Sequence, residues 1–511
     1  MSTLTLYPEN EQLPRGERIV FNLYMVTALV LFVLMMLLGL TMRSMQAQWL
    51  GDQPVLFYQI LTMHGAGMVG TMSLGTLAVM WFFLRKYVRL HVWAFTANYV
   101  LFMLGALAII AAVFAGGYAG AWTFLYPLPV KSMGIWSIHA AALFMVGYLL
   151  IGVGMLLFYM DAAAAIIRTY GNLGKGLGLQ WLFRGEINPD HPKAVVAGTM
   201  VIIANSLGIL AGAVVLVMSL VNAYFPEMAL NALLAKNLIY WFGHMVINAT
   251  IYMGVIAVYE LLGRYSGKPY KITRPFLWSW AVSTVFVIVV FPHHLLMDYA
   301  QPRWLAVMGQ VVSFGAGFPV FLVTAYGVLT NIYRSNIQWQ MPSRLMVLAV
   351  FGWAAGIVPA IIDGTISVNL VMHNTQWVPG HFHFYLLLGV LPMILALLFH
   401  VIGNRAHKVN DEGMDKVSLT VYALGAMAFA LAFLNAGHMS VPRRFATHIA
   451  QWVPNDQFGA IAALFVILAM LWFAGRIIFG LLRAPGDGYP GSSSDAGSTK
   501  RADVGAPHAT G

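Results

Sequence analysis

The chain has 511 residues, of which 60% are hydrophobic and only 9% are charged, a balance that excludes a soluble protein of this size and indicates many membrane-spanning helices. Its net charge of +10 does not indicate a nucleic-acid-binding protein, because no basic run is interleaved with aromatic residues on a polar surface. It has no cysteine, which excludes disulfides, thiolate-bound copper, iron–sulfur clusters and covalently attached haem in this chain.

Twelve stretches are long and apolar enough to cross a bilayer, since a spanning helix needs about 20 mostly apolar residues. In chain order they are 19–42, 54–84, 91–116, 134–160, 194–224, 231–263, 275–299, 303–333, 344–371, 376–403, 417–440 and 457–483. We therefore expect an all-α membrane bundle of about 12 transmembrane helices. Residues 1–18 are expected to form a cytoplasmic N-terminal segment, 19–483 one membrane domain, and the Gly- and Ser-rich 484–511 a disordered cytoplasmic tail.

Positive charge is distributed unevenly between the predicted loops. Loops that follow even-numbered spans carry 16 lysines and arginines, whereas loops that follow odd-numbered spans carry six. Cytoplasmic loops are the ones enriched in lysine and arginine, so this bias predicts that both termini lie in the cytoplasm.

Six of the 15 histidines fall within predicted spans and share one depth, the outer half of the bilayer. They are His64, His244, His293, His294, His381 and His383. Ionisable side chains at this depth are costly and are usually functional. Eight of the other nine we interpret as structural, since most lie in loops, at helix ends or in the tail: His91, His139, His191, His400, His407, His438, His448 and His508.

The pair His381 and His383 lies on one predicted helix, where a spacing of two residues turns the side chains about 200° apart. The two rings must therefore serve different centres. Imidazole binds haem iron and copper well, so one helix carrying one axial ligand for each of two haems explains the spacing. The remaining candidates, His244, His293 and His294, can supply three imidazoles to one copper or non-haem iron ion.

The sequences FGHMV, FPHHLLMD, HNTQWVPGHFHF and VPRRF occur in this order on predicted spans 6, 7 and 10 and after span 11. Together they resemble the catalytic subunit I of the haem-copper oxidase superfamily over the whole membrane domain, and the last two most resemble its B-type branch. The resemblance implies a fold like that of cytochrome c oxidase subunit I, two haems, one low-spin and one high-spin, and one further metal ion, copper or non-haem iron. It also implies a bacterial-type inner membrane and an electron donor, either a cupredoxin-type or cytochrome c-type subunit or quinol.

The resemblance further implies that His64 and His383 bind the low-spin haem and that His381 is the proximal ligand of the high-spin haem. The implied ligands of the second metal are His244, His293 and His294.

The resemblance also extends to predicted loops outside the membrane. It implies that His373 lies near the haem propionates and that Arg443 and Arg444 pair with them. Paired arginines in a loop that the charge bias places outside fit this role, because a guanidinium group matches a carboxylate.

The chain departs from the dioxygen-reducing members at a tyrosine that is crosslinked to a metal-ligating histidine in those enzymes. Four residues after His244 the chain has Asn248, and six residues before the His-His pair it has Val287. Tyr252 lies two turns from His244, too far to couple to it directly.

Splitting the O–O bond of dioxygen needs four electrons, one of which a redox-active phenol supplies. Coupling two nitric oxide molecules needs only two electrons. We therefore favour nitric oxide reduction to nitrous oxide, with Asn248 as a metal ligand, a hydrogen-bonding group near the metal or a structural helix–helix contact. Dioxygen reduction to water, by a cytochrome c or quinol oxidase, remains the alternative, and a transporter or channel with structural histidines is a third interpretation.

Proton pumping is left open by the sequence. Many pumping members have a glutamate two residues after the span-6 histidine, where this chain has Val246. The buried acids that remain are Glu260, Asp298 and Asp363, and Glu260 either begins a proton path near the cytoplasmic end of span 6 or is an interfacial residue.

Overall fold

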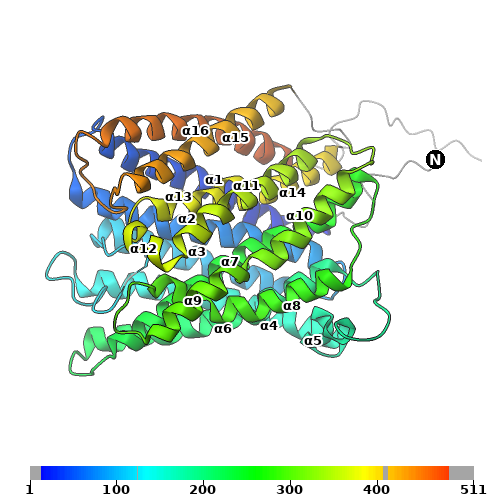
Figure 1. Cartoon of the computed structure of the whole chain (residues 1–511), viewed down its shortest axis with the longest axis horizontal. Helices are drawn as coiled ribbons and strands as arrows, with labels where there is room; N and C mark the ends of the chain where they lie inside the picture. Colours follow the sequence, from blue (N-terminus) through cyan, green and yellow to red (C-terminus); the bar gives the residue numbers. More distant parts are fainter. Residues whose placement is uncertain (1–12, 124, 407–412, 483–511) are drawn as a thin grey trace, which may run out of the picture.

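The fold is a bundle of helices that run side by side along the long axis of the molecule (Figure 1). The computed structural model describes residues 13–123, 125–406 and 413–482. Within these ranges twelve helical spans are long and apolar enough to cross a membrane, which confirms the predicted all-α architecture. The predicted tail, 484–511, and most of the predicted N-terminal segment lie outside the described residues.

Ten of the spans contain one long helix each. They are α1 (Arg15–Gln46), α2 (Pro54–Leu84), α3 (Val92–Ile110, continued by a π-helical turn to Ala115), α4 (Ile138–Tyr170), α6 (Lys193–Tyr224), α7 (Ala232–Ser266), α8 (Arg274–Val289, continued by a 3₁₀ turn to Leu295), α11 (Met341–Asp363), α15 (Gly413–His438) and α16 (Val453–Leu482). The short helices α5 (Leu173–Leu177) and α12 (Ile366–Met372) lie at opposite ends of the bundle (Figure 1).

The other two spans are interrupted. Span 8 consists of α9 (Arg303–Ala316) and α10 (Phe318–Ile332), separated at Gly317. Span 10 consists of α13 (Trp377–His383), a π-helical stretch Phe384–Val390, and α14 (Leu391–Ala406). Pro392 has no N–H to donate to the carbonyl four residues earlier, which is consistent with wider π-type bonding in the preceding turn.

Two predicted spans had wrong boundaries. The fourth span begins at Ile138, not 134, because Ser137 caps it by accepting a hydrogen bond from the Ala140 N–H, and it continues to Tyr170, not 160, through an alanine run that favours helix. The ninth span ends at Asp363 and not at 371, because Asn369 donates to the Asp363 carbonyl and carboxylate and closes a turn between α11 and α12.

The spans that carry most of the candidate histidines are the most deeply buried in the bundle. In its most apolar window span 10 is fully buried, and α2 and α7 are 83% buried, whereas span 8 is only 17% buried. The helices α2, α7, α13 and α14 therefore form the centre, and the others separate them from the surroundings. This arrangement places His64, His244, His381 and His383 inside the protein rather than facing lipid.

Candidate metal and cofactor site

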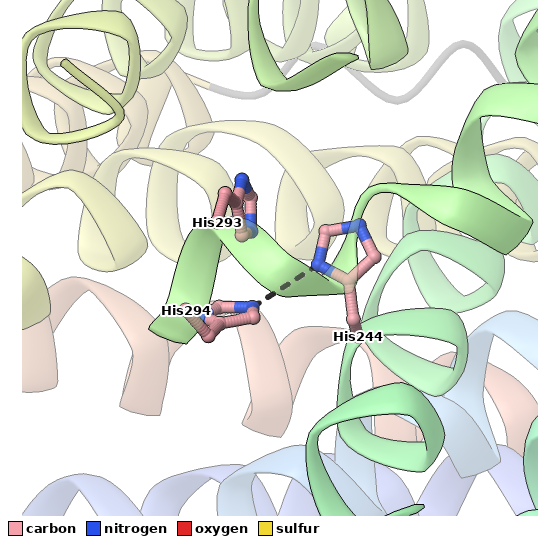
Figure 2. Close-up of side chains that lie close together, drawn as sticks. All are labelled: His244, His293 and His294. Atoms are coloured by element: carbon pink, nitrogen blue, oxygen red, sulfur yellow. Dashed lines mark hydrogen bonds between the residues drawn. The ribbon is translucent and has the colours of Figure 1, made fainter. Parts of the chain in front are cut away.

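Three histidines converge at one point between α7 and the 3₁₀ turn after α8 (Figure 2). His244 comes from α7, and His293 and His294 come from the turn. One ligand nitrogen from each ring lies within 4.8 Å of the others, and His244 Nδ1 is 3.1 Å from His294 Nε2. Metal–imidazole bonds are about 2.0–2.1 Å long, so small ring movements would let three such nitrogens bind one ion.

Local geometry explains why two adjacent histidines face the same point. The chain leaves α8 at Val289 and continues as a tight turn that contains Pro292, and the rings of His293 and His294 stand edge to face, 4.2 Å apart. The turn packs directly on α9 at Gly309, where a Cβ atom would lie only 2.8 Å from the backbone nitrogen of His293. His293 Nδ1 is 2.8 Å from Ser313 Oγ, which leaves Nε2 for an ion.

Asn248 contacts His244 and points away from the three-nitrogen cluster. Its amide nitrogen is 2.8 Å from His244 Nε2 and 3.0 Å from the His244 carbonyl, one turn earlier on α7. The amide therefore holds the ring nitrogen opposite the one that faces His294. This geometry favours a role in orienting His244 over direct metal ligation.

Tyr240 is a residue near the site that the sequence analysis missed. Its ring stacks on His294 with centroids 5.4 Å apart and an interplanar angle of 19°. The signal was present in the sequence, because Tyr240 lies four residues before His244 and so shares its face of α7.

A second group of histidines lines a cavity between α1, α2, α13, α15 and α16. His64 and His383 face this cavity from different helices. The Nδ1 atom of His64 is 2.6 Å from the Met35 carbonyl, and that of His383 is 2.6 Å from the Pro379 carbonyl. With Nδ1–H donating, both rings leave Nε2 free for an iron atom, which is the arrangement that an axial haem ligand requires.

His381 and His383 face different surroundings, as their spacing predicts. His383 stacks on Phe433 of α15, with ring centroids 4.8 Å apart. The cavity that His383 lines includes none of the three clustered histidines. His381 lies on the other side, edge to face with Tyr385 and close enough to His293 and His294 for electrostatic interaction. One helix therefore presents one imidazole to each of two compartments.

The outer loops bring Arg443 beside the cavity by backbone pairing. Thr375 forms a bridge with Pro442, and the Arg443 N–H donates to the Asn374 carbonyl. Arg443 lines the cavity of His64 and His383, and among the described residues its Nε has no hydrogen-bond partner.

Electrostatics at this loop favour an anionic ligand. Burial and, second to it, the charge of neighbouring Arg444 lower the pKa of Arg443 to about 10, so the group stays protonated at neutral pH. Arg444, whose pKa burial also lowers, donates to Thr123 Oγ1 at 3.1 Å. Burial and then Arg443 lower the pKa of His373, so His373 is uncharged at neutral pH. Two buried guanidinium groups fit the carboxylates of a cofactor.

The remaining candidates have structural partners. Val246 is buried, Asp298 pairs with Lys236 at 2.6 Å, and Glu260 accepts a hydrogen bond from the Tyr87 hydroxyl. Histidines interpreted as structural have hydrogen-bond partners in five described cases: His91 with Asp161, His139 with Tyr224, His191 with the Gly176 carbonyl, His400 with Tyr265, and His448 with Asp456.

Comparison with known proteins agrees with this arrangement. The family described as cytochrome c and quinol oxidase polypeptide I matches residues 19–471. The heme-copper oxidase subunit I+III of Aeropyrum pernix is 24% identical over 402 residues, which cover 75% of this chain and 45% of that protein. Cytochrome c oxidase subunit 1 of Thermus thermophilus is 24% identical over 362 residues, covering 63% of this chain and 61% of the relative.

Other relatives are matched over more of their length. Cytochrome c oxidase subunit 1 of Thermostichus vulcanus is 22% identical over 481 residues, covering 89% of this chain and 82% of that protein. A solved heme-copper terminal oxidase dimer superposes with a TM-score of 0.74 at 18% identity, over 93% of this chain and 85% of that one, and so shares the fold. Because the family match spans most of the membrane bundle, the chain belongs to the subunit I family of the haem-copper oxidase superfamily.

Proposed function

We propose that this chain is the catalytic subunit of a respiratory terminal reductase that converts nitric oxide to nitrous oxide. In this proposal His64 and His383 bind a low-spin haem, and His381 binds a high-spin haem on the other side of α13. The second metal, copper or non-haem iron, is held by His244, His293 and His294. Bound together, the high-spin haem and this metal supply two redox centres beside one open coordination position.

The observation that carries the choice of substrate is Asn248. It occupies the position beside His244 Nε2 where a redox-active phenol would have to sit to be coupled to that ring. The reaction 2 NO + 2 e⁻ + 2 H⁺ → N₂O + H₂O needs two electrons, which two metal centres can supply. An amide cannot donate an electron, but it can hold His244 in the orientation that the metal requires.

An apolar cavity beside the cluster suits a diatomic substrate that dissolves in lipid. It is lined by residues of α2, α4, α6 and α7. Gly243, Val246 and Ile247 form its wall next to His244. Its lining also includes Val153 and Leu210, which are 50% and 51% exposed on the outer faces of α4 and α6.

The proposal includes a setting and partners. The lipid bilayer is a bacterial-type inner membrane, and both termini lie in the cytoplasm, as the loop charges favour. Electrons arrive from a cupredoxin-type or cytochrome c-type subunit or from quinol, since the chain has no cysteine to hold a thiolate-bound redox centre of its own. Arg443, Arg444 and His373 bind the haem propionates, which the buried guanidinium groups favour.

Two assays on the purified enzyme test this proposal. Under anaerobic conditions we expect nitrous oxide to form from nitric oxide, and we expect oxygen uptake with the same electron donor to be much slower. Metal analysis, as iron and copper per haem, then identifies the second metal. Fast oxygen uptake without nitrous oxide formation would overturn the nitric oxide proposal, and a preparation without a Soret absorption band would overturn the haem sites altogether.

One observation favours the second candidate, dioxygen reduction. Tyr240 stacks on His294 and is the phenol in direct ring contact with the three-histidine cluster among the described residues. A phenol there could supply the fourth electron without a covalent bond to His244. This alternative, in which a cytochrome c or quinol oxidase reduces oxygen to water, makes Tyr240 essential, and nitric oxide reduction does not.

A further inference from the structure

A buried ionic cluster lies at the outer end of α1, and the proposed chemistry does not use it. Arg43 of α1 donates to Asp456 of α16 at 2.7 Å, and His448 Nδ1 is 2.6 Å from the other oxygen of the same carboxylate. The side chains of all three are at most 2% exposed. The carboxylate of Asp456 therefore sits between a guanidinium and an imidazole in a medium with little water.

The cluster touches the cavity of the low-spin site through Arg43. Arg43 lines that cavity together with His64 and His383. Its guanidinium lies 4.1 Å from the centroid of the Phe433 ring, which stacks in turn on His383. Gln376 accepts hydrogen bonds from both terminal nitrogens of Arg43, at 3.0 and 3.1 Å, which fixes the group in place.

Charges in this position act on whatever occupies the cavity. Inside a protein, Coulomb interactions are several-fold stronger than in water, so a buried charge that changes nearby shifts the equilibrium between two oxidation states. Arg43 alone would favour the state that carries one more electron. Asp456 offsets that effect, and the hydrogen bond from His448 determines how much negative charge the carboxylate presents.

Stability alone gives weak reason for the cluster. A buried ion pair adds little to folding on balance, because desolvation of both charges offsets their attraction. Within the described residues His448 Nε2 and Arg43 Nε are buried without hydrogen-bond partners, which adds to the cost. Gly459 of α16 leaves room for the arginine, since a Cβ atom there would lie 3.2 Å from Arg43 Nε.

We infer that Asp456 and His448 are positioning residues that set the reduction potential of the low-spin haem through Arg43. The inference rests on the proposed assignment of that haem to His64 and His383. Removing the negative charge of Asp456 leaves Arg43 uncompensated and favours ferrous haem. Removing the hydrogen bond from His448 concentrates negative charge on Asp456 and favours ferric haem.

The test is a spectroelectrochemical titration of the purified holoenzyme that follows the low-spin haem absorption band. For Asp456→Asn we expect the ferrous-to-ferric ratio at a fixed potential to rise by about tenfold, which is a shift of about 59 mV for a one-electron couple. For His448→Leu we expect a smaller shift in the opposite direction. For His448→Gln, which keeps a donor, the potential should return toward the wild-type value.

A matched control is available at the other end of the bundle. The carboxylate of Asp415 is also fully buried. One of its oxygens accepts a hydrogen bond from Trp472 at 2.9 Å, and the other lies 4.0 Å from Arg476 Nε. It lies on α15 about 27 Å before Phe433, at 1.5 Å per residue. Asp415→Asn removes the same charge and should leave the low-spin potential unchanged.

The outcomes distinguish a failure of the role of Asp456 and His448 from a failure of the haem assignment. Equal potentials for Asp456→Asn and Asp415→Asn, or shifts of the same sign for Asp456→Asn and His448→Leu, would overturn the inference while leaving the haem assignment intact. If Asp456→Asn fails to assemble with haem, the two His448 variants, which alter a loop outside the helices, decide the matter by themselves. Absence of a low-spin haem spectrum in the wild-type enzyme would overturn the haem assignment and this inference with it.

Discussion

Two side chains on α7, Asn248 and His244, are in contact at the proposed site of the second metal. The amide contacts Nε2 of the imidazole, so Nδ1 is the nitrogen left to face His294. Oxygen and nitrogen of an amide are interchangeable by rotation, and with a metal on Nδ1 the amide oxygen would accept from Nε2–H. Partners of this kind fix the tautomer and the ring orientation of a metal ligand.

We therefore expect Asn248→Leu to lower the affinity of the enzyme for its second metal by about tenfold or more, the usual effect of removing such a partner. Metal analysis after dialysis against a chelator measures this, and the low-spin haem spectrum should not change. Asn237→Leu is the matched control, because Asn237 is on the same helix but bonds to the Leu233 carbonyl and Gln301. Equal metal retention in both variants would contradict the role of Asn248.

Tyr240 separates the two candidate reactions. In Tyr240→Phe the ring that stacks on His294 remains and only the hydroxyl group is lost. If nitric oxide is the substrate, we expect nitrous oxide formation to be unchanged, because no phenol takes part. Loss of oxygen reduction in the same variant, in an enzyme whose wild type reduces oxygen rapidly, would instead support the dioxygen alternative.

At the scale of secondary-structure elements, interruptions in the helices place the functional groups. The π-helical stretch after α13 ends just before Pro392, and the hydroxyl of Tyr422 on α15 donates to the Leu387 carbonyl within it. The 3₁₀ turn after α8 aims His293 and His294 at α7.

The packing of α4 and α6 around the apolar cavity makes a prediction about substrate access. Ala213 lines the cavity, whereas its neighbour Val214 is 50% exposed on the outer face of α6. We expect Ala213→Phe to lower kcat/KM for the gas by about tenfold, equivalent to about 1.4 kcal/mol, with kcat at saturating gas little changed. Val214→Phe adds the same ring on the other face, and similar kinetics for the two variants would show that the cavity is not the route.

At the scale of the whole molecule, loop charge predicts the membrane orientation, and burial distinguishes the helices that carry the proposed site. Lysine and arginine concentrate in the loops that follow even-numbered spans, while Arg443 and Arg444 are partly buried exceptions, of which Arg443 lines a cavity. An exception to the charge bias is explained when the residue faces a ligand instead of water. The most buried spans carry His64, His244, His381 and His383, whereas the least buried, Arg303–Ile332, carries no histidine.

Topology follows from the same bias and is open to direct measurement. Reporter fusions after Gly267, in a loop between α7 and α8, should show a cytoplasmic location, and fusions after Tyr299, between α8 and α9, an external one. A fusion at the C-terminus should behave like the fusion after Gly267. The reverse pattern would invert the membrane orientation and place the Arg443 loop on the cytoplasmic side.

Sequence alone was sufficient for the number of spans, and it singled out the histidines of the proposed sites, because both follow from local patterns. A run of about 20 apolar residues predicts a spanning helix wherever it occurs. Six imidazoles at one depth, two of them on opposite sides of one helix, indicate metal and haem ligation before any fold is known.

Contacts between distant segments were decided by the tertiary structure alone. Arg43 and Asp456 are 413 residues apart, and nothing near either one in the sequence indicates the other. His448 was interpreted as a loop histidine, and its burial against Asp456 became evident only in the folded bundle. Local sequence encodes helix length and the face of each side chain, whereas the partner that a buried charge meets depends on how all twelve spans pack.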